Sequence, residues 1–288
     1  MTASATRPAP LSPAIIASAV TAALAEDLGL AGDLTTTATI PAEARASAVI
    51  ASRKAGVVSG IAVARATFET LDNGVAFEAV AADGDSIAAG AVLARVDGPA
   101  RAILTGERVA LNFMGRMCGI ATLTRAYVDI VAGTKAAIAD TRKTTPGLRA
   151  FEKYAVRCGG GHNHRFGLFD AILIKDNHIA ACGSLGAAVA AARAHAGHLV
   201  KIEVEVDTLA QLEAALAFPI DAILLDNMSP DTLRQAVAMA KGRVLLEASG
   251  GVNLETVRAI ADTGVDLISV GALTHSAPVL DLGLDFPE

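Results

Sequence analysis

The chain has 288 residues, enough for one large domain or two modest ones with their own cores. It is 52% hydrophobic but only 3% aromatic, so its apolar residues are mostly Ala, Val, Leu and Ile, which suit helices packed over parallel strands. A net charge of −6 argues against a nucleic-acid partner, because neutralising phosphates requires a basic face.

The apolar N-terminal stretch Ala14–Ala25 imitates a signal peptide, yet Arg7 is the only basic residue before it. Ser12 as N-cap and Pro13 at the first helical position predict a helix there instead. The three cysteines form no CxxC pair and are odd in number, which favours a reducing compartment. We therefore expect a cytoplasmic protein without a membrane partner, since no stretch reaches the ~18 apolar residues of a membrane span.

The N-terminal part of the chain reads as a structural α/β domain. Short strand-like segments occur at Ala48–Arg53, Ala76–Ala81 and Val92–Val96, separated by turns that contain glycine. A long helical region follows at Leu104–Val131.

The rest of the chain alternates between apolar, β-rich runs and helical stretches. The last four runs recur about every 20 residues, the repeat of a compact βα unit. Amphipathic helices are predicted between them at Leu209–Ala217, Ser229–Ala240 and Leu254–Thr263. This alternation predicts an incomplete parallel α/β barrel, although a doubly wound open sheet would give the same pattern. The six predicted strands are Ala136–Ala139, Ala171–Ile174, Val200–Val206, Ala222–Leu225, Val244–Leu246 and Leu267–Val270.

Every predicted strand ends in polar residues or glycine, which favours the barrel, because its working residues gather at the C-terminal ends of the strands. Four cations stand at or near these ends, and in an acidic protein they imply an anionic substrate. A single one would usually form a weak surface ion pair, but four at consecutive strand ends indicate a site. They are Arg142, Lys143, Arg165 and Lys175.

Carboxylates and glycines complete these strand ends. Glu203, Glu205 and Asp207 alternate along one strand and so should share a face. Their mutual repulsion calls for Mg²⁺, lysine partners or both. The turn Ser249–Gly251, which leads into the last predicted helix, suits a phosphate group, with Gly271 at the neighbouring strand end.

Two histidines, His162 and His164, follow three glycines. The glycines disfavour a strand that would place both side chains on one face as metal ligands, and no third ligand occurs at the spacing of a known metal motif. We therefore predict that His164 donates a hydrogen bond to an anion.

Taken together, these motifs resemble the quinolinate phosphoribosyltransferases, also called nicotinate-nucleotide pyrophosphorylases. The matching segments occur in the family's order from about residue 26 to residue 276, with no departure at a working position. They are Glu26–Gly29, Gly32–Thr36, Glu107–Phe113, Asp140–Arg149, Glu152–Gly161, Asn163–Arg165, Ile174–His178, Ile202–Asp207, Leu225–Met228, Glu247–Gly251 and Ser269–Ser276.

The resemblance implies an N-terminal α/β sandwich domain over residues 1–117, joined by the C-terminal tail at about 275–288. An incomplete, TIM-like α/β barrel over 118–274 would carry the active site. It also implies a homodimer in which Arg108 is donated across the interface to the partner's barrel. The implied reaction belongs to NAD biosynthesis: phosphoribosyl passes from phosphoribosyl pyrophosphate to quinolinate, and CO₂ is lost to give nicotinate mononucleotide.

Matched position by position, the resemblance assigns catalytic roles to Lys143, Lys175, Glu205 and Asp226. Glu205 and Asp226 would also be ligands of Mg²⁺, the expected cofactor. The implied quinolinate site is Arg108, Thr141, Arg142, Lys143, His164, Arg165 and Lys175. The implied phosphoribosyl pyrophosphate site is Lys143, Lys175, Glu205, Asp226, Ser249, Gly250, Gly251, Ser269, Val270 and Gly271.

Two rival functions share much of this pattern. A paralogue with another acceptor, such as nicotinate or a substrate linked to molybdate uptake, is the nearer one. A nicotinate enzyme must hold one carboxylate, for which three arginines and a histidine are excessive. A non-catalytic barrel that senses a phosphorylated metabolite could keep Ser249–Gly251, but it has no use for Glu205, Asp226 and both lysines.

Overall fold

The computed structural model describes residues 7–286, so positions 1–6 and 287–288 of the predicted domains lie outside it. The chain divides into two compact units. The first extends to Arg125 and also takes in Thr145–Gly160 and the tail from Ser276, while the second comprises Ala126–Thr144 and Gly161–His275. Over the described residues, no helix combines the length and the apolar character needed to cross a membrane.

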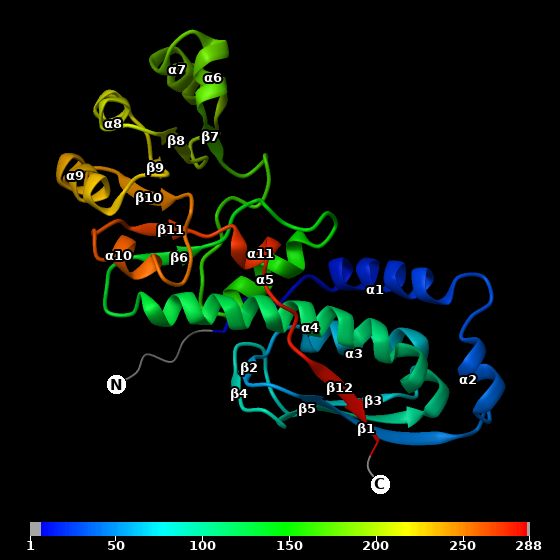
Figure 1. Ribbon diagram of the computed structural model, residues 1–288. Helices are drawn as coiled ribbons and strands as arrows, with labels where there is room; N and C mark the ends of the chain where they lie inside the picture. Colours follow the sequence, from blue (N-terminus) through cyan, green and yellow to red (C-terminus); the bar gives the residue numbers. More distant parts are fainter. Residues whose placement is uncertain (1–6, 287–288) are drawn as a thin grey trace. The chain divides into compact units, whose positions relative to one another are not determined.

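An antiparallel sheet in the order β12-β1-β5-β3 forms one layer of the first unit (Figure 1). Three of its strands lie at the predicted segments, and the fourth, β12, comes from the C-terminal tail and pairs with β1. A separate ribbon joins β2 and β4. The strands are β1 (Arg45–Ser52), β2 (Gly56–Val57), β3 (Ala76–Ala79), β4 (Ser86–Ile87), β5 (Val92–Pro99) and β12 (Leu282–Asp285).

Helices of the first unit include the predicted N-terminal helix, which is confirmed as α1, with Ser12 as N-cap and Pro13 in its first turn. The long predicted helix is α4, whose last residues belong to the second unit. The helices are α1 (Pro13–Leu28), α2 (Leu34–Thr39), α3 (Ile61–Leu71), α4 (Ala100–Ile130) and α5 (Arg149–Cys158).

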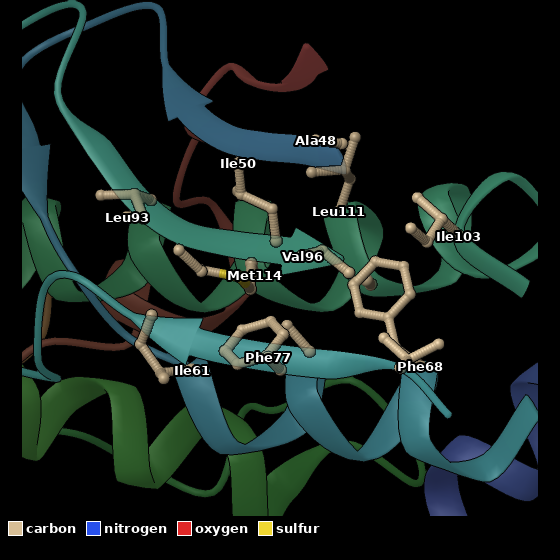
Figure 2. Close-up of a cluster of buried hydrophobic side chains, with 14 of the residues drawn as sticks. Ala48, Ile50, Ile61, Phe68, Phe77, Leu93, Val96, Ile103, Leu111 and Met114 are labelled. Carbon is tan, nitrogen blue, oxygen red and sulfur yellow. The ribbon is translucent and has the colours of Figure 1, made fainter. Parts of the chain in front are cut away.

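The core of the first unit forms where α3 and α4 pack on the sheet (Figure 2). Phe68 of α3 stacks against Phe77 of β3, with ring centroids 6.2 Å apart. Leu93 of β5 and Met114 of α4 are completely buried in the same cluster. Burying a side chain of this size stabilises a fold by about 1.5–3 kcal/mol, so this apolar cluster is the main source of the unit's stability.

The units divide at other positions than the predicted domains. The boundary falls after Arg125 rather than after residue 117, and α5 belongs to the first unit although the sequence placed it in the barrel over 118–274. Side-chain pairing explains this: Glu152 of α5 is completely buried and accepts a 2.7 Å hydrogen bond from Arg116 Nη2 of α4. A buried carboxylate requires such a cation, and the pair therefore holds α5 on the first unit.

The second unit is a six-stranded parallel sheet in the order β6-β11-β10-β9-β8-β7. From β7 to β11, each strand pairs with the next strand in the chain, and β6 pairs with β11. This is the strand order of a barrel that is left open between β6 and β7. The incomplete barrel is thus confirmed over the doubly wound sheet. Each predicted run contains one strand, and these are β6 (Ala137–Ala139), β7 (Ile172–Ile174), β8 (Ile202–Val206), β9 (Ala222–Asp226), β10 (Leu245–Ser249) and β11 (Leu267–Ser269).

Helices α7 to α10 of the second unit lie along one face of this sheet (Figure 1). One helix start was predicted wrongly: α10 begins at Val257, because the Asn253 side chain first closes a turn by accepting from Thr256 N at 2.9 Å. The Ser249–Gly251 turn therefore does not lead directly into a helix N-terminus. The helices are α6 (Asp176–Cys182), α7 (Leu185–His195), α8 (Leu209–Ala215), α9 (Pro230–Ala240), α10 (Val257–Ala261) and α11 (Ala272–His275).

Asp33 caps α2 by accepting from Thr36 N at 2.9 Å, and it also accepts from the Thr105 hydroxyl of α4 at 2.9 Å. Asp33→Ala is therefore expected to lower the free energy of unfolding by about 1 kcal/mol near neutral pH. The bonds from Thr36 lower the pKa of Asp33, so this stabilisation exists above the ordinary carboxyl pKa and is lost as the pH falls through the lowered one. Denaturant unfolding at neutral and strongly acidic pH measures the difference, and equal losses at both would contradict the assignment.

Candidate active site

The C-terminal ends of all six strands of the second unit surround one cavity of about 760 Å³. A cavity of this size accommodates a small-molecule substrate, and it lies where α/β barrels carry their sites. It is lined by Thr141, Arg142, Lys143, His164, Arg165, Leu173, Lys175, Glu205, Leu224, Asp226, Asn227, Glu247, Ser249, Gly250, Gly251, Val252, Ser269, Val270, Gly271, Ala272 and His275.

Every residue predicted for the two substrate sites lines this cavity except Arg108. Arg108 lies on α4 in the first unit, where its exposed side chain is 3.8 Å from the Glu107 carboxylate. The predicted common face of three carboxylates is wrong for Asp207, which follows the end of β8 and is exposed. The substrate roles themselves remain predictions from the resemblance.

Arg142 and Arg165 form a pair of cations on the cavity wall. The Nε atom of each is buried and has no hydrogen-bond partner among the described residues. Burial lowers the pKa of Arg165, and the charge of Arg142 lowers it further, so the two guanidinium groups are close enough to repel. A buried polar group without a partner destabilises by about 1–3 kcal/mol, which an anion with several oxygens would relieve.

Lys175 and two carboxylates face the same cavity from neighbouring strands. Lys175 Nζ lies 2.6 Å from Glu205 Oε2, so one of the expected lysine partners is present. Asp226 ends the adjacent strand β9 and accepts from its neighbour Asn227 at 2.7 Å. Carboxylate oxygens are ligands that Mg²⁺ prefers, so these residues fit the expected cofactor.

Glycines expose backbone along the cavity at the end of β10. Gly250 has φ +90°, and a Cβ there would collide with the Asn227 side chain. Gly251 also has a positive φ, of +63°. Such backbone leaves N–H groups open to a ligand, as phosphate sites require, even without the helix that the sequence predicted directly after this turn.

His164 is held by the protein on both ring nitrogens. Arg165 N donates to Nδ1 at 2.7 Å, and Nε2 lies 3.0 Å from Glu203 Oε2. Asp140 holds the loop itself by accepting from His164 N at 2.9 Å and from Asn163 Nδ2 at 2.6 Å. In this arrangement Nε2 faces Glu203 and the ring lines the cavity, so the hydrogen bond from His164 to a substrate anion stays a prediction.

Three polar residues that line the cavity were assigned no role from the sequence. Glu247 lies on β10 two positions before Ser249, and Asn227 and His275 follow strand ends. Glu247 could have been predicted to face the cavity together with Ser249, because residues i and i+2 of a strand share a face. For Asn227 the signal was its place directly after β9.

The chain matches two family models that together span most of it. The N-terminal domain of quinolinate phosphoribosyl transferase matches residues 33–118, and its C-terminal domain matches residues 120–285.

Relatives of known name agree with these matches. A probable carboxylating nicotinate-nucleotide pyrophosphorylase of Bacillus subtilis is 49% identical over 260 residues, which cover 90% of this chain and 89% of the relative. A carboxylating nicotinate-nucleotide pyrophosphorylase of Mycobacterium leprae is 49% identical over 268 residues, covering 91% and 94%. The solved nicotinate-nucleotide pyrophosphorylase of Francisella tularensis has a TM-score of 0.93 at 38% identity, covering 96% of this chain and 98% of the other. The chain thus belongs to the quinolinate phosphoribosyltransferase family.

Proposed function

We propose that this protein transfers phosphoribosyl from phosphoribosyl pyrophosphate to the ring nitrogen of quinolinate and decarboxylates the product to nicotinate mononucleotide. Pyrophosphate and CO₂ are the other products, and the step belongs to NAD biosynthesis. The observation that carries the proposal is the Arg142–Arg165 pair, whose repulsion and unpartnered Nε atoms call for an acceptor with more than one carboxylate.

Quinolinate binds through its two adjacent carboxylates. Arg142 and Arg165 each donate two parallel hydrogen bonds, while Thr141 and Lys175 fix the ring from the neighbouring strand ends. His164 supports Arg165 from the next position in the chain. These contacts orient the ring nitrogen toward the sugar and so reduce the entropy that is lost on reaching the transition state.

Phosphoribosyl pyrophosphate binds at the other side of the cavity. The backbone of Ser249–Gly251 and of Ser269–Gly271 takes the 5′-phosphate, and Lys143 faces the pyrophosphate. Glu205 and Asp226 stabilise the positive charge that develops on the sugar as pyrophosphate leaves. Glu205 and Asp226 would also hold Mg²⁺, which would supply positive charge to the departing pyrophosphate.

Quaternisation of the ring nitrogen prepares the second step. The bond from ring carbon C2 to its carboxylate breaks, CO₂ leaves, and the electron pair stays on C2, where the cationic ring stabilises it. The arginines that held the carboxylate position this step, and no covalent nucleophile is required.

The assembly proposed for this enzyme is a cytoplasmic homodimer. Arg108 then completes the partner's quinolinate site as a third arginine. Its exposure on α4 supports this, because a side chain that served only its own unit would gain little from a 3.8 Å contact with Glu107 in solvent.

The activity test combines the purified protein with quinolinate and phosphoribosyl pyrophosphate, with and without Mg²⁺. Formation of nicotinate mononucleotide and CO₂ only when the metal is present is the expected result. Turnover of nicotinate in place of quinolinate would indicate the paralogue with another acceptor. Binding of both ligands without turnover would indicate a metabolite sensor.

Gly250→Ala is expected to weaken phosphoribosyl pyrophosphate binding about ten-fold or more. The new Cβ meets Asn227 and is held at a φ that side chains rarely adopt, a strain of about 1–3 kcal/mol. Calorimetry with each substrate separately measures the loss, and quinolinate binding should hardly change.

Gly242→Ala is the matched control for this variant. Gly242 has a φ of +70° and no atom within 4 Å of the added Cβ, and it lies just after α9 outside the cavity lining. It carries the backbone strain without touching the site. Equal effects of both variants on phosphoribosyl pyrophosphate binding would refute the role given to the Ser249–Gly251 turn.

A further inference from the structure

Three titratable side chains meet beside the cavity, and two of them, His164 and Glu247, line it. His164 Nε2 lies 3.0 Å from Glu203 Oε2 and 3.6 Å from Glu247 Oε1. One potential ligand atom from each of the three residues lies within 4.8 Å of the others. Glu203 and Glu247 are both buried, with 8% and 2% of their surface exposed. Two carboxyl groups and one imidazole therefore share a space with little water.

The backbone decides the state of His164. Arg165 N–H points at Nδ1 at 2.7 Å, so Nδ1 is an acceptor and carries no proton. Nε2 then carries a proton and donates to Glu203 at 3.0 Å.

Glu247 lies beside two other carboxylates. Its Oε1 is buried and has no hydrogen-bond partner among the described residues. The charges of Glu203 and Asp140 raise its pKa, whereas His164 and the Ser269 hydroxyl of β11 lower it. Its sheet partners on β9 and β11 are leucines. Burial, and next the charge of Glu203, raise the pKa of Glu247 to about 7, so it holds a proton below neutral pH.

The position of this acid matches a need of the proposed reaction. Loss of CO₂ leaves an electron pair on ring carbon C2, which must receive a proton before the product is complete. Arginine side chains do not release a proton near neutral pH, and Lys175 is paired with Glu205, so neither is suited to donate the proton to C2. Glu247 lies on the same strand face as Ser249 of the phosphate turn and within reach of His164, the chain neighbour of Arg165. It thus stands between the groups that hold the sugar phosphate and those that hold the carboxylates.

We propose that Glu247 is the acid that protonates ring carbon C2 as the bond to the leaving carboxylate breaks, with Glu203 and His164 as positioning residues. This inference rests on the proposed function. As the bond from C2 to the carboxylate breaks, CO₂ takes no electrons from C2, and the C2 pair forms a C–H bond with the Glu247 proton. Glu247 is left as a carboxylate and regains a proton from water after the product leaves. No oxidant, reductant or further reactant is required.

The test separates the two chemical steps in a single turnover with enzyme in excess. Pyrophosphate and CO₂ are measured from the same quenched samples for the wild type, Glu247→Gln and Glu247→Asp. Glu247→Gln should release pyrophosphate within about three-fold of the wild-type rate but release CO₂ at least about a hundred-fold more slowly. The phosphoribosylated dicarboxylate should then accumulate. Glu247→Asp keeps an acidic proton and should recover part of the CO₂ release.

Asp226→Asn is the matched comparison, because it removes a carboxylate of the same cavity that acts in the first step. It should slow pyrophosphate and CO₂ release together. A Glu247→Gln enzyme that releases both products at wild-type rates would overturn the proposal, and so would one in which both fall equally. A stoichiometric metal that the purified wild type holds and Glu247→Gln lacks would also overturn it, because Glu247 would then be a deprotonated ligand.

A measurement on the wild type alone covers the case in which the variants do not fold. The single-turnover rate of CO₂ release should fall as the pH rises through about 7, because Glu247 then loses its proton. A rate that stays constant from about pH 6 to about pH 9 would overturn the assignment. If the wild type releases neither pyrophosphate nor CO₂, the proposed function has failed; if it releases both, only the role of Glu247 is in question.

Discussion

Arg165→Ala and Arg142→Ala are each expected to weaken quinolinate binding by about 2–4 kcal/mol, with a much smaller effect on phosphoribosyl pyrophosphate. Each change removes a bidentate contact to a carboxylate at a site where the guanidinium Nε is already withdrawn from water. Arg165→Lys should recover little, because a lysine keeps the charge but cannot donate two parallel hydrogen bonds. Calorimetry with each ligand separately measures the losses.

Arg193→Ala is the control for these variants. Arg193 lies on α7, bonded to Pro219 O, and does not line the cavity. Its loss should leave both affinities unchanged. If Arg142→Ala or Arg165→Ala weakens both ligands equally, the arginine contributes general positive charge and not a carboxylate contact.

Arg108→Ala and Lys175→Ala should each reduce the activity of the respective homodimer to background. The first lacks the arginine donated to its partner, and the second lacks a barrel lysine that lies 2.6 Å from Glu205. Mixing equal amounts and allowing the subunits to exchange makes about half of the dimers mixed, and each mixed dimer holds one intact site. Activity should therefore return to about one quarter of the wild-type value, as two-fold symmetry dictates.

The control is a mixture of two variants that damage the same site, Lys175→Ala and Lys143→Ala, both of the second unit. Each subunit of a mixed dimer then has a damaged barrel, so no site is intact and no activity should return. Exchange is followed independently with differently tagged subunits. Arg108 would be excluded from the partner's site if exchange is complete and the Arg108→Ala and Lys175→Ala mixture stays inactive.

Much of the barrel could be predicted because its signals are local. An apolar run such as Ala222–Leu225 is bounded by polar residues, and a helix signal follows within a few positions. The position of Asp226 directly after an apolar run was sufficient to place it at the carboxyl edge of the sheet, and the structure finds it on the cavity wall. The cluster of cations needed no long-range information either, because parallel strands bring their carboxyl ends together.

What could not be predicted depends on pairings between distant residues. The membership of α5 in the first unit follows from the contact of Glu152 with Arg116, which no periodicity reveals. The contacts of the His164 ring nitrogens with Glu203 and the backbone of Arg165 were likewise not predicted. In both cases a polar residue was recognised and its partner was not, because the partner is fixed only once the chain has folded.

Strand β12 has a consequence for how the chain is synthesised. The ribosome makes β1 first and β12 last, yet the two pair from Val49 with Asp285 to Ser52 with Leu282, and Arg53 forms an ion pair with Asp285. All six strands of the second unit have left the ribosome before this pairing can form. During translation the edge of β1 is therefore open to strands of other nascent chains, and the first unit to be started is the last to be finished.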